Sequence, residues 1–285
     1  MLQNLSKLAV LYITKENKLN NAFFWSFLTN YLGIGVNFLS VVLLARMLTP
    51  SEIGTYAIAG AIFAIAQIFR DMGISGYLLR EKELTPIKLS GAMTIVWLLC
   101  TSISLLLLLA SLPLAAFYSI PELTTIFQIL CLNIFLIPCG TIAQTHLRRA
   151  MRFKALGAIE LTSQIIHLIV ALILAYYSFG AVSLAIASLS ATICTLLLVN
   201  IAYKGKKQFV LNFANANIVL PSISTIGLAN ILTTLNNRVT TLIIGKSISE
   251  NAVAIMDQAL ATIELSNQLL MQAIQKVLLP YFTKF

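Results

Sequence analysis

The stretch that decides the fold class is FLSVVLLARMLTPSEIGTYAIAGAIFAIAQIFRDMGISGYLLREKELTP, residues 38–86. Its first apolar run ends at Arg46, and a short polar turn follows at residues 49–52. A second apolar run, rich in Gly and Ala, closes with Arg-Asp-Met-Gly at residues 70–73. Two membrane helices joined by a tight turn have this pattern. In a bilayer, backbone polar groups must be satisfied within the helix, and small residues let neighbouring helices approach closely.

The composition of the whole chain agrees with this interpretation. Hydrophobic residues make up 59% of the 285 positions and charged residues only 10%, with a mean hydropathy of +0.90. Soluble domains carry about 25% charged residues, whereas apolar segments long enough to cross a hydrocarbon core of about 30 Å recur throughout this chain. We therefore predict an all-α polytopic membrane protein of about eight transmembrane helices. The expected spans are residues 23–45, 52–70, 89–112, 123–145, 155–178, 180–203, 218–245 and 252–275.

Basic residues alternate between the connectors of these spans. The connectors on one side carry 16 of the 19 Lys and Arg residues, and those on the other side carry only Arg46 and Lys246. By the positive-inside rule the rich side is cytoplasmic, which places both termini there. The formal net charge of +9 is then mostly a signal of topology and of attraction to membrane lipids. It does not indicate a nucleic-acid partner.

An internal repeat is visible at an offset of 200 residues. LLARMLTPSEIGTYAIAGA (43–61) aligns without gaps with IIGKSISENAVAIMDQALA (243–261), so that Arg46 meets Lys246. Six spans separate the copies, so both copies have the same orientation, as in transporters built from two parallel lobes. We expect a complete six-helix lobe at 1–207 and the first two helices of a second lobe at 208–285. The chain is then either C-terminally truncated relative to a twelve- or fourteen-helix protein, or two chains combine.

Five motifs carry a resemblance to a known family. They are LLARMLTPSEIGTYAIA (43–59), DMGISGYLLREKEL (71–84), LRRAMRFKALGAIEL (147–161), LIIGKSISENAVAIMDQA (242–259) and VLLPYFTKF (277–285). With them the chain resembles the polysaccharide biosynthesis proteins. These are the Wzx-type oligosaccharide flippases of the MOP superfamily, which also includes the MATE exporters. The resemblance implies a MOP-like or MATE-like fold in the bacterial inner (plasma) membrane.

The activity implied by this resemblance is transport. Such proteins flip an undecaprenyl-diphosphate-linked oligosaccharide unit by alternating access, coupled to an ion, for O-antigen lipopolysaccharide or another surface polysaccharide. The implied partners are this polyprenyl diphosphate lipid and a polysaccharide polymerase or other assembly proteins. We expect no cofactor and no enzyme activity, because the sequence has no nucleophile–base pair, metal-ligand cluster or phosphate-binding loop. Two alternatives stay open: a MATE-like exporter of cationic amphiphiles, and a truncated scaffold of polysaccharide assembly that does not transport.

An anionic, hydrated headgroup needs a cationic and polar path between the lobes, so polar side chains should share single helix faces. Asn30 and Asn37 do so in the first span, as candidates for substrate binding. In the fifth span Glu160 and His167 do so together with Gln164, and the first two are candidates for ion coupling. Each has a simpler interpretation. The asparagines can be hydrogen-bonding glue between helices, Glu160 can pair with loop arginines, and His167 can be a satisfied neutral imidazole rather than a proton carrier.

The charged residues of the second copy raise the same choice. Arg238 lies at membrane depth, where it needs a carboxylate partner, a water-filled cavity or an anionic substrate. Asp257 and Glu264 on the next span are the candidate partners and are also candidates for ion coupling. Arg46 and Lys246 end their spans at the opposite leaflet. There they can extend to the interface or attract the diphosphate at the exit.

Overall fold

The computed structural model describes residues 25, 28–71, 78, 85–150, 152–203 and 238–263. Every regular element within these residues is a helix. They are the first helix (Leu28–Met47), α2 (Pro50–Asp71), α4 (Pro86–Tyr118), α5 (Glu122–Leu136), α6 (Pro138–Arg149), α7 (Phe153–Tyr176), α8 (Val182–Ala202) and two helices at 238–247 and 250–263. Five of them are long and apolar enough to cross a membrane, and the bent pair α5 and α6 makes a sixth candidate.

The chain is therefore an all-α polytopic membrane protein, as predicted. The six spans expected before residue 207 all coincide with these helices. The seventh and eighth expected spans, 218–245 and 252–275, lie only partly within the described residues, so the total of eight stays a prediction.

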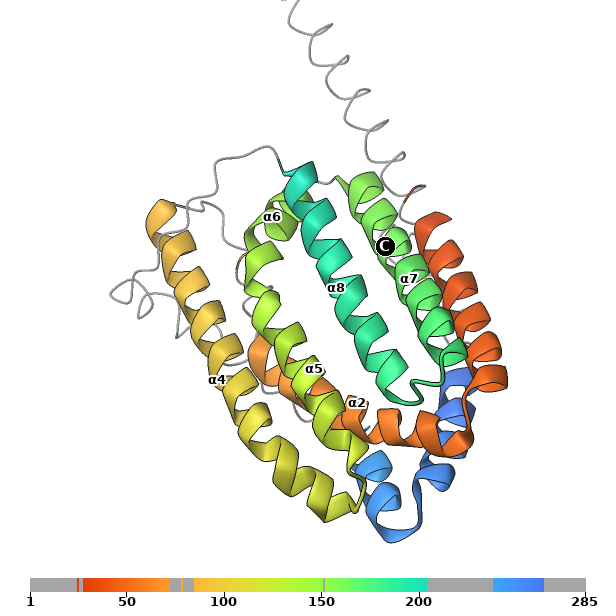
Figure 1. The fold of residues 1–285 in the computed structure, drawn as a ribbon. Coiled ribbons are helices and arrows are strands. Elements are labelled where there is room, and N and C mark those ends of the chain that lie inside the picture. The colour runs from red at the N-terminus through yellow and green to blue at the C-terminus, as the bar shows by residue number, and fades with distance from the viewer. Residues whose placement is uncertain are drawn as a thin grey trace, which may run out of the picture.

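The helices before residue 203 form one bundle. α4, α5, α8 and α7 lie side by side in that order, with the first helix at the edge next to α7 (Figure 1). α2 crosses this row and packs mainly on α5 and α4 (Figure 1). Neighbours in the row are thus not always neighbours in sequence, and this order brings the first helix against α7.

The polar turn after the first helix is a capping motif. The Thr49 amide and hydroxyl donate to Glu52 Oε2 at 2.7 and 2.9 Å, and the Glu52 amide lies 3.3 Å from Thr49 Oγ1. Two backbone donors at the start of α2 are satisfied in this reciprocal way. Pro50 begins α2, where its missing N–H costs nothing. The turn therefore reverses the chain without leaving its polar groups unsatisfied at the membrane boundary.

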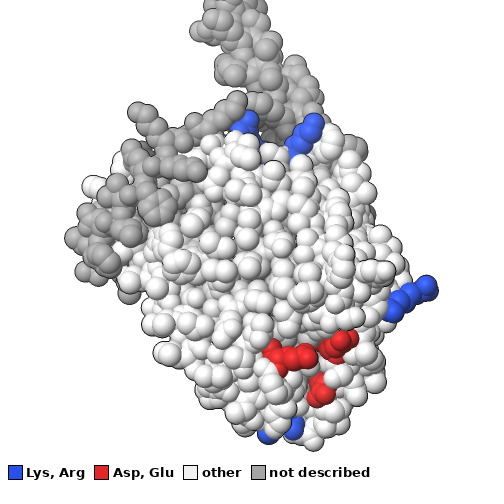
Figure 2. All heavy atoms as spheres, in the orientation of Figure 1, with Lys and Arg blue, Asp and Glu red and all other residues white. Residues whose placement is uncertain are grey.

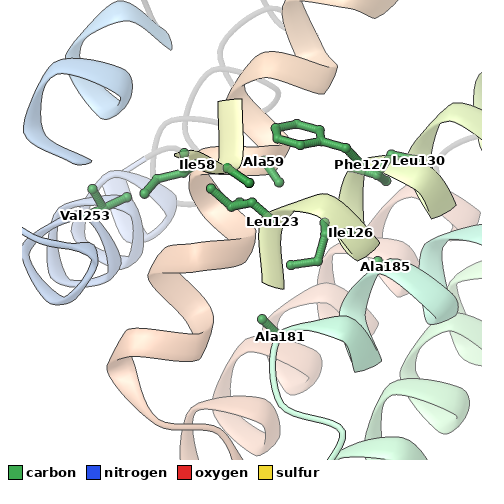
Figure 3. Packing of buried hydrophobic residues seen from close by; sticks show 10 residues of the cluster. Ile58, Ala59, Leu123, Ile126, Phe127, Leu130, Ala181, Ala185 and Val253 are labelled. Carbon is green, nitrogen blue, oxygen red and sulfur yellow. The ribbon is translucent and has the colours of Figure 1, made fainter. Parts of the chain in front are cut away.

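The largest buried cluster joins α2, α5 and α8 at one end of the bundle. Figure 3 shows Ile58 of α2 and Phe127 of α5 within it, and Val253 reaches it from the helix at 250–263. These three side chains are fully buried. In lipid, such contacts stabilise the bundle mainly through close packing, because the surrounding acyl chains are as apolar as the side chains.

The fourth expected span, 123–145, is not one straight helix. It is broken between α5 and α6, whose axes differ by 50°. Pro138 begins α6, and its ring and missing N–H prevent the helix from continuing unchanged. The amide of Ile137 bonds to Ile134 O and that of Gly140 to Ile137 O, as tight three-residue turns. The bend lets α6 pack on α8, where Gly140 lies against the Leu196 side chain.

Polar side chains join α5 to α8 inside the apolar bundle. Asn133 is only 3% exposed. Its amide nitrogen donates to Ser188 Oγ at 3.0 Å, and its amide oxygen accepts from the Thr192 hydroxyl at 2.9 Å. Both ends of this buried amide are satisfied, so it serves as interhelical glue.

The outer surface of the bundle is apolar, as a lipid-facing surface must be. On α7, Ile165, Ile169 and Ile173 are exposed at intervals of four residues, whereas Leu168 and Ala171 on the opposite side are buried. Figure 2 shows a broad area without charged side chains across the middle of one face, with charged groups above and below it. The helices thus present a hydrocarbon-compatible belt between two charged ends.

The helices at 238–247 and 250–263, here called the second hairpin, repeat the geometry of the first turn. The amides of Leu48 and Ile53 bond to the carbonyls of Leu44 and Thr49, and the same two bonds recur 200 residues later, from Ile248 to Ile244 and from Val253 to Ser249. The turns of the aligned segments 43–61 and 243–261 thus share these two backbone hydrogen bonds.

The second hairpin packs against α2. A Cβ atom on Gly54 would lie 1.8 Å from the backbone oxygen of Glu250, so only glycine permits this approach of the two backbones. The Ser51 hydroxyl donates to Glu250 Oε1 at 3.0 Å beside it. The starts of two helices that are equivalent in the repeat therefore meet directly.

Candidate functional site

A polar cavity of about 600 Å³ lies between the first helix and α7, with Ala191 of α8 at its wall. Eight of its fifteen lining residues are polar. These are Thr29, Asn30, Asn37, Ser40, Glu160, Ser163, Gln164 and His167. Polar and ionisable side chains within membrane helices are costly and mark functional sites, so this concentration of polar groups within two apolar helices makes the cavity the candidate site.

Helical periodicity explains why these residues meet. Asn30, Gly33 and Asn37 recur at three and seven residues on one face of the first helix, and Glu160, Gln164 and His167 recur at four and seven on α7. The lining of the first helix extends from Thr29 to Leu44, a length of about 22 Å at 1.5 Å per residue. The cavity thus follows much of the depth of a membrane.

Two glycines bring the helices together beside the cavity. A Cβ on Gly157 of α7 would lie 2.4 Å from Thr29 Oγ1, and a Cβ on Gly33 would lie 3.0 Å from Gln164 Oε1. Gly157 therefore depends on the absence of a side chain, whereas a Cβ at Gly33 would only displace the end of the Gln164 side chain. Gly35, on the same helix as Gly33, has nothing within 4 Å of its Cβ position. Gly33 lets the Gln164 amide approach the first helix, and Gly157 sets the helix separation near one end.

The electrostatic character of the lining differs from the cationic path that we expected. Glu160 is the one carboxylate and His167 the one imidazole among the lining residues, and the lining includes no Lys or Arg. The remaining polar groups are neutral amides and hydroxyls. The cavity also lies between two helices of the bundle that precedes residue 203, the first helix and α7.

Cations lie beyond one end of the lining. Lys154 Nζ is 4.2 Å from the centroid of the Trp25 ring, a cation–π contact. The Trp25 carbonyl accepts from the Thr29 hydroxyl at 2.7 Å, and Thr29 is the first lining residue of this helix. Arg152 lies two residues before Lys154 and directs Nη1 to the Ala202 carbonyl at 3.4 Å.

The structure resolves one of the two partners proposed for Arg238. Arg238 Nη1 is 3.9 Å from Asp257 Oδ1 across the second hairpin, with 42% and 36% of the two side chains exposed. This pair does not line the cavity. Glu264, the other proposed partner, lies outside the described residues.

The two pseudo-equivalent cations at the opposite leaflet have different surroundings. The Lys246 ammonium donates to the Phe117 carbonyl and lies 4.5 Å from the centroid of the Phe117 ring. Phe117 is in the last turn of α4, where the helix dipole favours a cation. Arg46 is exposed at the end of the first helix. Lys246 thus fastens the second hairpin to α4, whereas Arg46 remains open to solvent or lipid headgroups.

Sequence reasoning therefore identified most of the polar lining and missed the rest. Asn30, Asn37, Glu160, Gln164 and His167 were all singled out, and the structure brings them together. Thr29, Ser40 and Ser163 were missed, although Ser40 and Ser163 lie three residues after Asn37 and Glu160 and so extend the same faces. The contact between Lys154 and Trp25 joins positions 129 residues apart and has no local signal.

Several known proteins are similar to this chain over part of its length. A succinoglycan biosynthesis transport protein of Rhizobium meliloti (strain 1021) is 26% identical over 163 residues, which cover 56% of this chain and 32% of that protein. A lipopolysaccharide biosynthesis protein, WzxC of Escherichia coli (strain K12), is 24% identical over 143 residues, 48% of this chain and 28% of that protein. A teichuronic acid biosynthesis protein, TuaB of Bacillus subtilis (strain 168), is 29% identical over 134 residues, 46% and 27% respectively.

The matched segments thus span about three tenths of these relatives' own length. The family comparison covers far more of this chain, because the sequence model described as "Polysaccharide biosynthesis protein" matches residues 43–285. That range includes α7 with its half of the cavity and the second hairpin. The chain belongs to the polysaccharide biosynthesis protein family.

Proposed function

We propose that this chain takes part in moving lipid-linked oligosaccharide headgroups across the bacterial inner membrane, with the polar cavity as the path through its first lobe. The observation that carries the proposal is the cavity itself: about 600 Å³ lined by amides and hydroxyls inside an apolar bundle. Family membership supports it, as do relatives named for succinoglycan transport and lipopolysaccharide biosynthesis. In this proposal 1–207 is one lobe and 208–285 begins another.

The chemistry of the lining suits sugars. A sugar hydroxyl both donates and accepts hydrogen bonds, and an amide side chain offers one acceptor and two donors. Asn30, Asn37 and Gln164 therefore supply the groups that replace water around a saccharide. Without such replacements each buried hydroxyl would cost several kcal/mol, about 2–7 in transfer experiments. The proposed role of Asn30 and Asn37 is to bind the sugar portion of the headgroup.

The energy source in this proposal is an ion gradient. Glu160 and His167 share one face of α7 and line the same cavity. A proton or cation on Glu160 would neutralise the one lining carboxylate, and the His167 imidazole can bind or release a proton. Binding of a proton or cation to these two residues would change the charge of the path. The charge would then differ between the two states in which the path is open to one side or the other. The pair Arg238–Asp257 lies elsewhere and would couple to the same cycle only through movement of the second hairpin.

A MATE-like exporter of cationic amphiphiles is the second candidate. It is favoured by one observation: the lining contains a carboxylate and lacks Lys and Arg. An organic cation would bind beside Glu160, whereas an anionic diphosphate would find no counter-charge inside. The two candidates therefore differ in what enters the cavity. In the first it is the sugar portion of a lipid-linked oligosaccharide, and in the second it is an organic cation.

A reconstitution assay tests both functions. The chain, Asn37→Leu and Gly35→Ala are placed in proteoliposomes, and two processes are measured: flipping of a fluorescent lipid-diphosphate-oligosaccharide and export of a cationic dye. We expect flipping by the wild-type chain, a loss of about tenfold in Asn37→Leu as its hydrogen bonds to substrate are removed, and no loss in Gly35→Ala. Dye export without flipping would favour the exporter. A folded chain that moves neither substrate would contradict both functions.

A further inference from the structure

We propose that Lys154, held over Trp25 at the inner end of the cavity, is a phosphate subsite for the same substrate. In this arrangement Lys154 binds the anionic phosphate of a glycosylated lipid, and the neutral cavity beyond it binds the attached sugars. The identity of the substrate rests on the function proposed above, whereas the position of the subsite rests on contacts between the first helix and α7.

Three contacts form a continuous ladder between these two helices. Trp25 meets Lys154, Thr29 meets Gly157, and Gly33 meets Gln164. The positions advance by four residues on the first helix and by three and then seven on α7, so all members of each series share one helix face. Numbers increase in the same direction on both helices, so the helices run parallel. Lys154 is therefore at the end of the face that leads into the cavity.

The distances along the helix suit a phosphate followed by a sugar. Lys154 precedes Glu160 by six residues and Gln164 by ten, or about 9 and 15 Å along the helix axis. A chain of sugar rings attached to a phosphate at Lys154 would therefore extend past Glu160 and Gln164. The phosphate would remain at the membrane boundary, where Trp residues are enriched.

Charge balance assigns the phosphate to this end rather than to the interior. The lining has no Lys or Arg, and transfer of an unpaired anion into a membrane is costly. Lys154 is exposed. No carboxylate among the described residues forms an ion pair with Lys154. Its ammonium lies over the Trp25 ring, a contact that positions the cation without supplying a negative charge. An anion is the ligand that such a group lacks.

The same charge could attract a bilayer phospholipid, so the experiment separates the two sources of phosphate. The full chain is placed in nanodiscs of neutral phosphatidylcholine, with or without anionic phosphatidylglycerol. Binding of two probes is measured: a dodecyl-diphosphate-linked N-acetylglucosamine and the uncharged dodecyl glucoside. The variants are Lys154→Gln, Lys154→Arg and Arg148→Gln. Arg148 is an exposed cation near the same loop but belongs to α6, outside the ladder. The variant Arg148→Gln thus removes one positive charge outside the ladder and is the matched control for Lys154→Gln.

The expected result is specific to one probe and one position. Lys154→Gln should weaken the diphosphate probe about tenfold, since charge-assisted hydrogen bonds are the strong ones, and leave dodecyl glucoside unchanged. Lys154→Arg should retain binding, and Arg148→Gln should match the wild type. Equal losses in Lys154→Gln and Arg148→Gln would overturn the subsite in favour of general surface charge. If phosphatidylglycerol lowers probe binding by the wild type to the level of Lys154→Gln, Lys154 binds bilayer lipid, which would also overturn the subsite.

The same experiment tests the proposed function separately from the phosphate subsite. If the wild-type chain, folded as judged by circular dichroism and size exclusion, binds neither probe, then the glycolipid function is wrong. If it binds both probes and Lys154→Gln leaves the affinity for each unchanged, the glycolipid function stands and the phosphate subsite is wrong.

Discussion

Two helix interfaces of this protein contain the same kinds of polar residue and use them in opposite ways. Between α5 and α8, Asn133 is buried and both ends of its amide are bonded to Ser188 and Thr192. Between the first helix and α7, Asn30, Asn37 and Gln164 line an open space of about 600 Å³. At the first interface the polar groups bond to one another across the two helices, and at the second they line a cavity.

The difference lies in what faces each amide. Ser188 and Thr192 lie one helical turn apart on α8, at the depth of Asn133, and they satisfy its donor and its acceptor. Across the cavity the helices approach at the glycines, Gly33 and Gly157, and the amides lie beside these points of contact. An Asn in a membrane helix therefore does not by itself indicate a transport path. The residues that face it on the neighbouring helix determine whether it joins the helices or lines a path.

Of the two interfaces, the larger effect on stability is expected at the glycine contact beside the cavity. Gly157→Ala would place a Cβ 2.4 Å from Thr29 Oγ1 and 2.8 Å from its Cβ, so the two helices must separate. We expect a loss of about 2–3 kcal/mol in the free energy of unfolding, as for other overpacked sites. Equilibrium unfolding in mixed micelles with increasing dodecyl sulfate measures it.

Gly140→Ala is the matched control for this prediction. Its Cβ would lie 2.4 Å from Leu196 Cδ2, the far end of a flexible side chain. The helix-propensity gain of Gly to Ala is the same in both variants, so the difference between them isolates the cost of packing. Equal and small changes in the two variants would contradict the close approach of the first helix and α7.

The next effect separates the two interfaces directly. Asn133→Leu removes the two hydrogen bonds that join α5 to α8 at Ser188 and Thr192, so we expect a loss of about 1.5 kcal/mol, near the upper end for such bonds in membranes. Asn37→Leu should change stability by less than about 0.5 kcal/mol, because a group facing a cavity strands no partner, yet it should reduce transport. If Asn37→Leu destabilises as much as Asn133→Leu, Asn37 is glue and not a lining residue.

The sequence predicted the faces of helices better than their partners. Apolar length and the distribution of basic residues located the spans, and helical spacing placed Asn30 with Asn37 and Glu160 with His167. Spacing on one helix says nothing of which helix faces it. The pairing of the first helix with α7, distant in sequence, thus needed the three-dimensional structure. The same limit hid Asn133, whose role depends on α8.

Two other differences between the prediction and the structure have different causes, the first local in sequence and the second distant. The break before α6 had a visible signal in Pro138, but a proline inside an apolar run can be tolerated in a membrane helix, so hydropathy alone extended the span through it. Lys246 was expected to extend to the interface or to attract the diphosphate. Its contact with the Phe117 carbonyl arises because the second hairpin packs on α4, a long-range event that no local pattern encodes.

A smaller effect is expected for the charged pair of the second hairpin. Arg238 and Asp257 are 3.9 Å apart and more than a third exposed, so their coupling should not exceed about 1 kcal/mol. A double-mutant cycle with Arg238→Gln and Asp257→Asn measures this coupling in the unfolding assay. A coupling several times larger would mean that lipid, not water, surrounds the pair.

The smallest effect on stability is expected at Gly33. In Gly33→Ala the new Cβ would lie 3.0 Å from Gln164 Oε1, the end of a flexible side chain that can shift by a few tenths of an ångström. Stability should match that of Gly35→Ala within about 0.5 kcal/mol, typical of a substitution without a packing cost. The displaced amide should nevertheless slow transport several-fold in Gly33→Ala alone. Equal transport rates in the two variants would remove Gln164 from the path.

Water access to the two asparagine positions tests the central claim most directly. In a chain whose four cysteines are replaced by alanine, Asn37→Cys and Asn133→Cys are reacted with a membrane-impermeant, charged maleimide added to either side of sealed vesicles. If the first helix and α7 enclose a water-filled path, the thiol introduced at position 37 reacts readily, and the thiol at position 133 stays unreactive until the protein is unfolded. Two equally unreactive positions would contradict the account, because the cavity between these helices would then be closed to water.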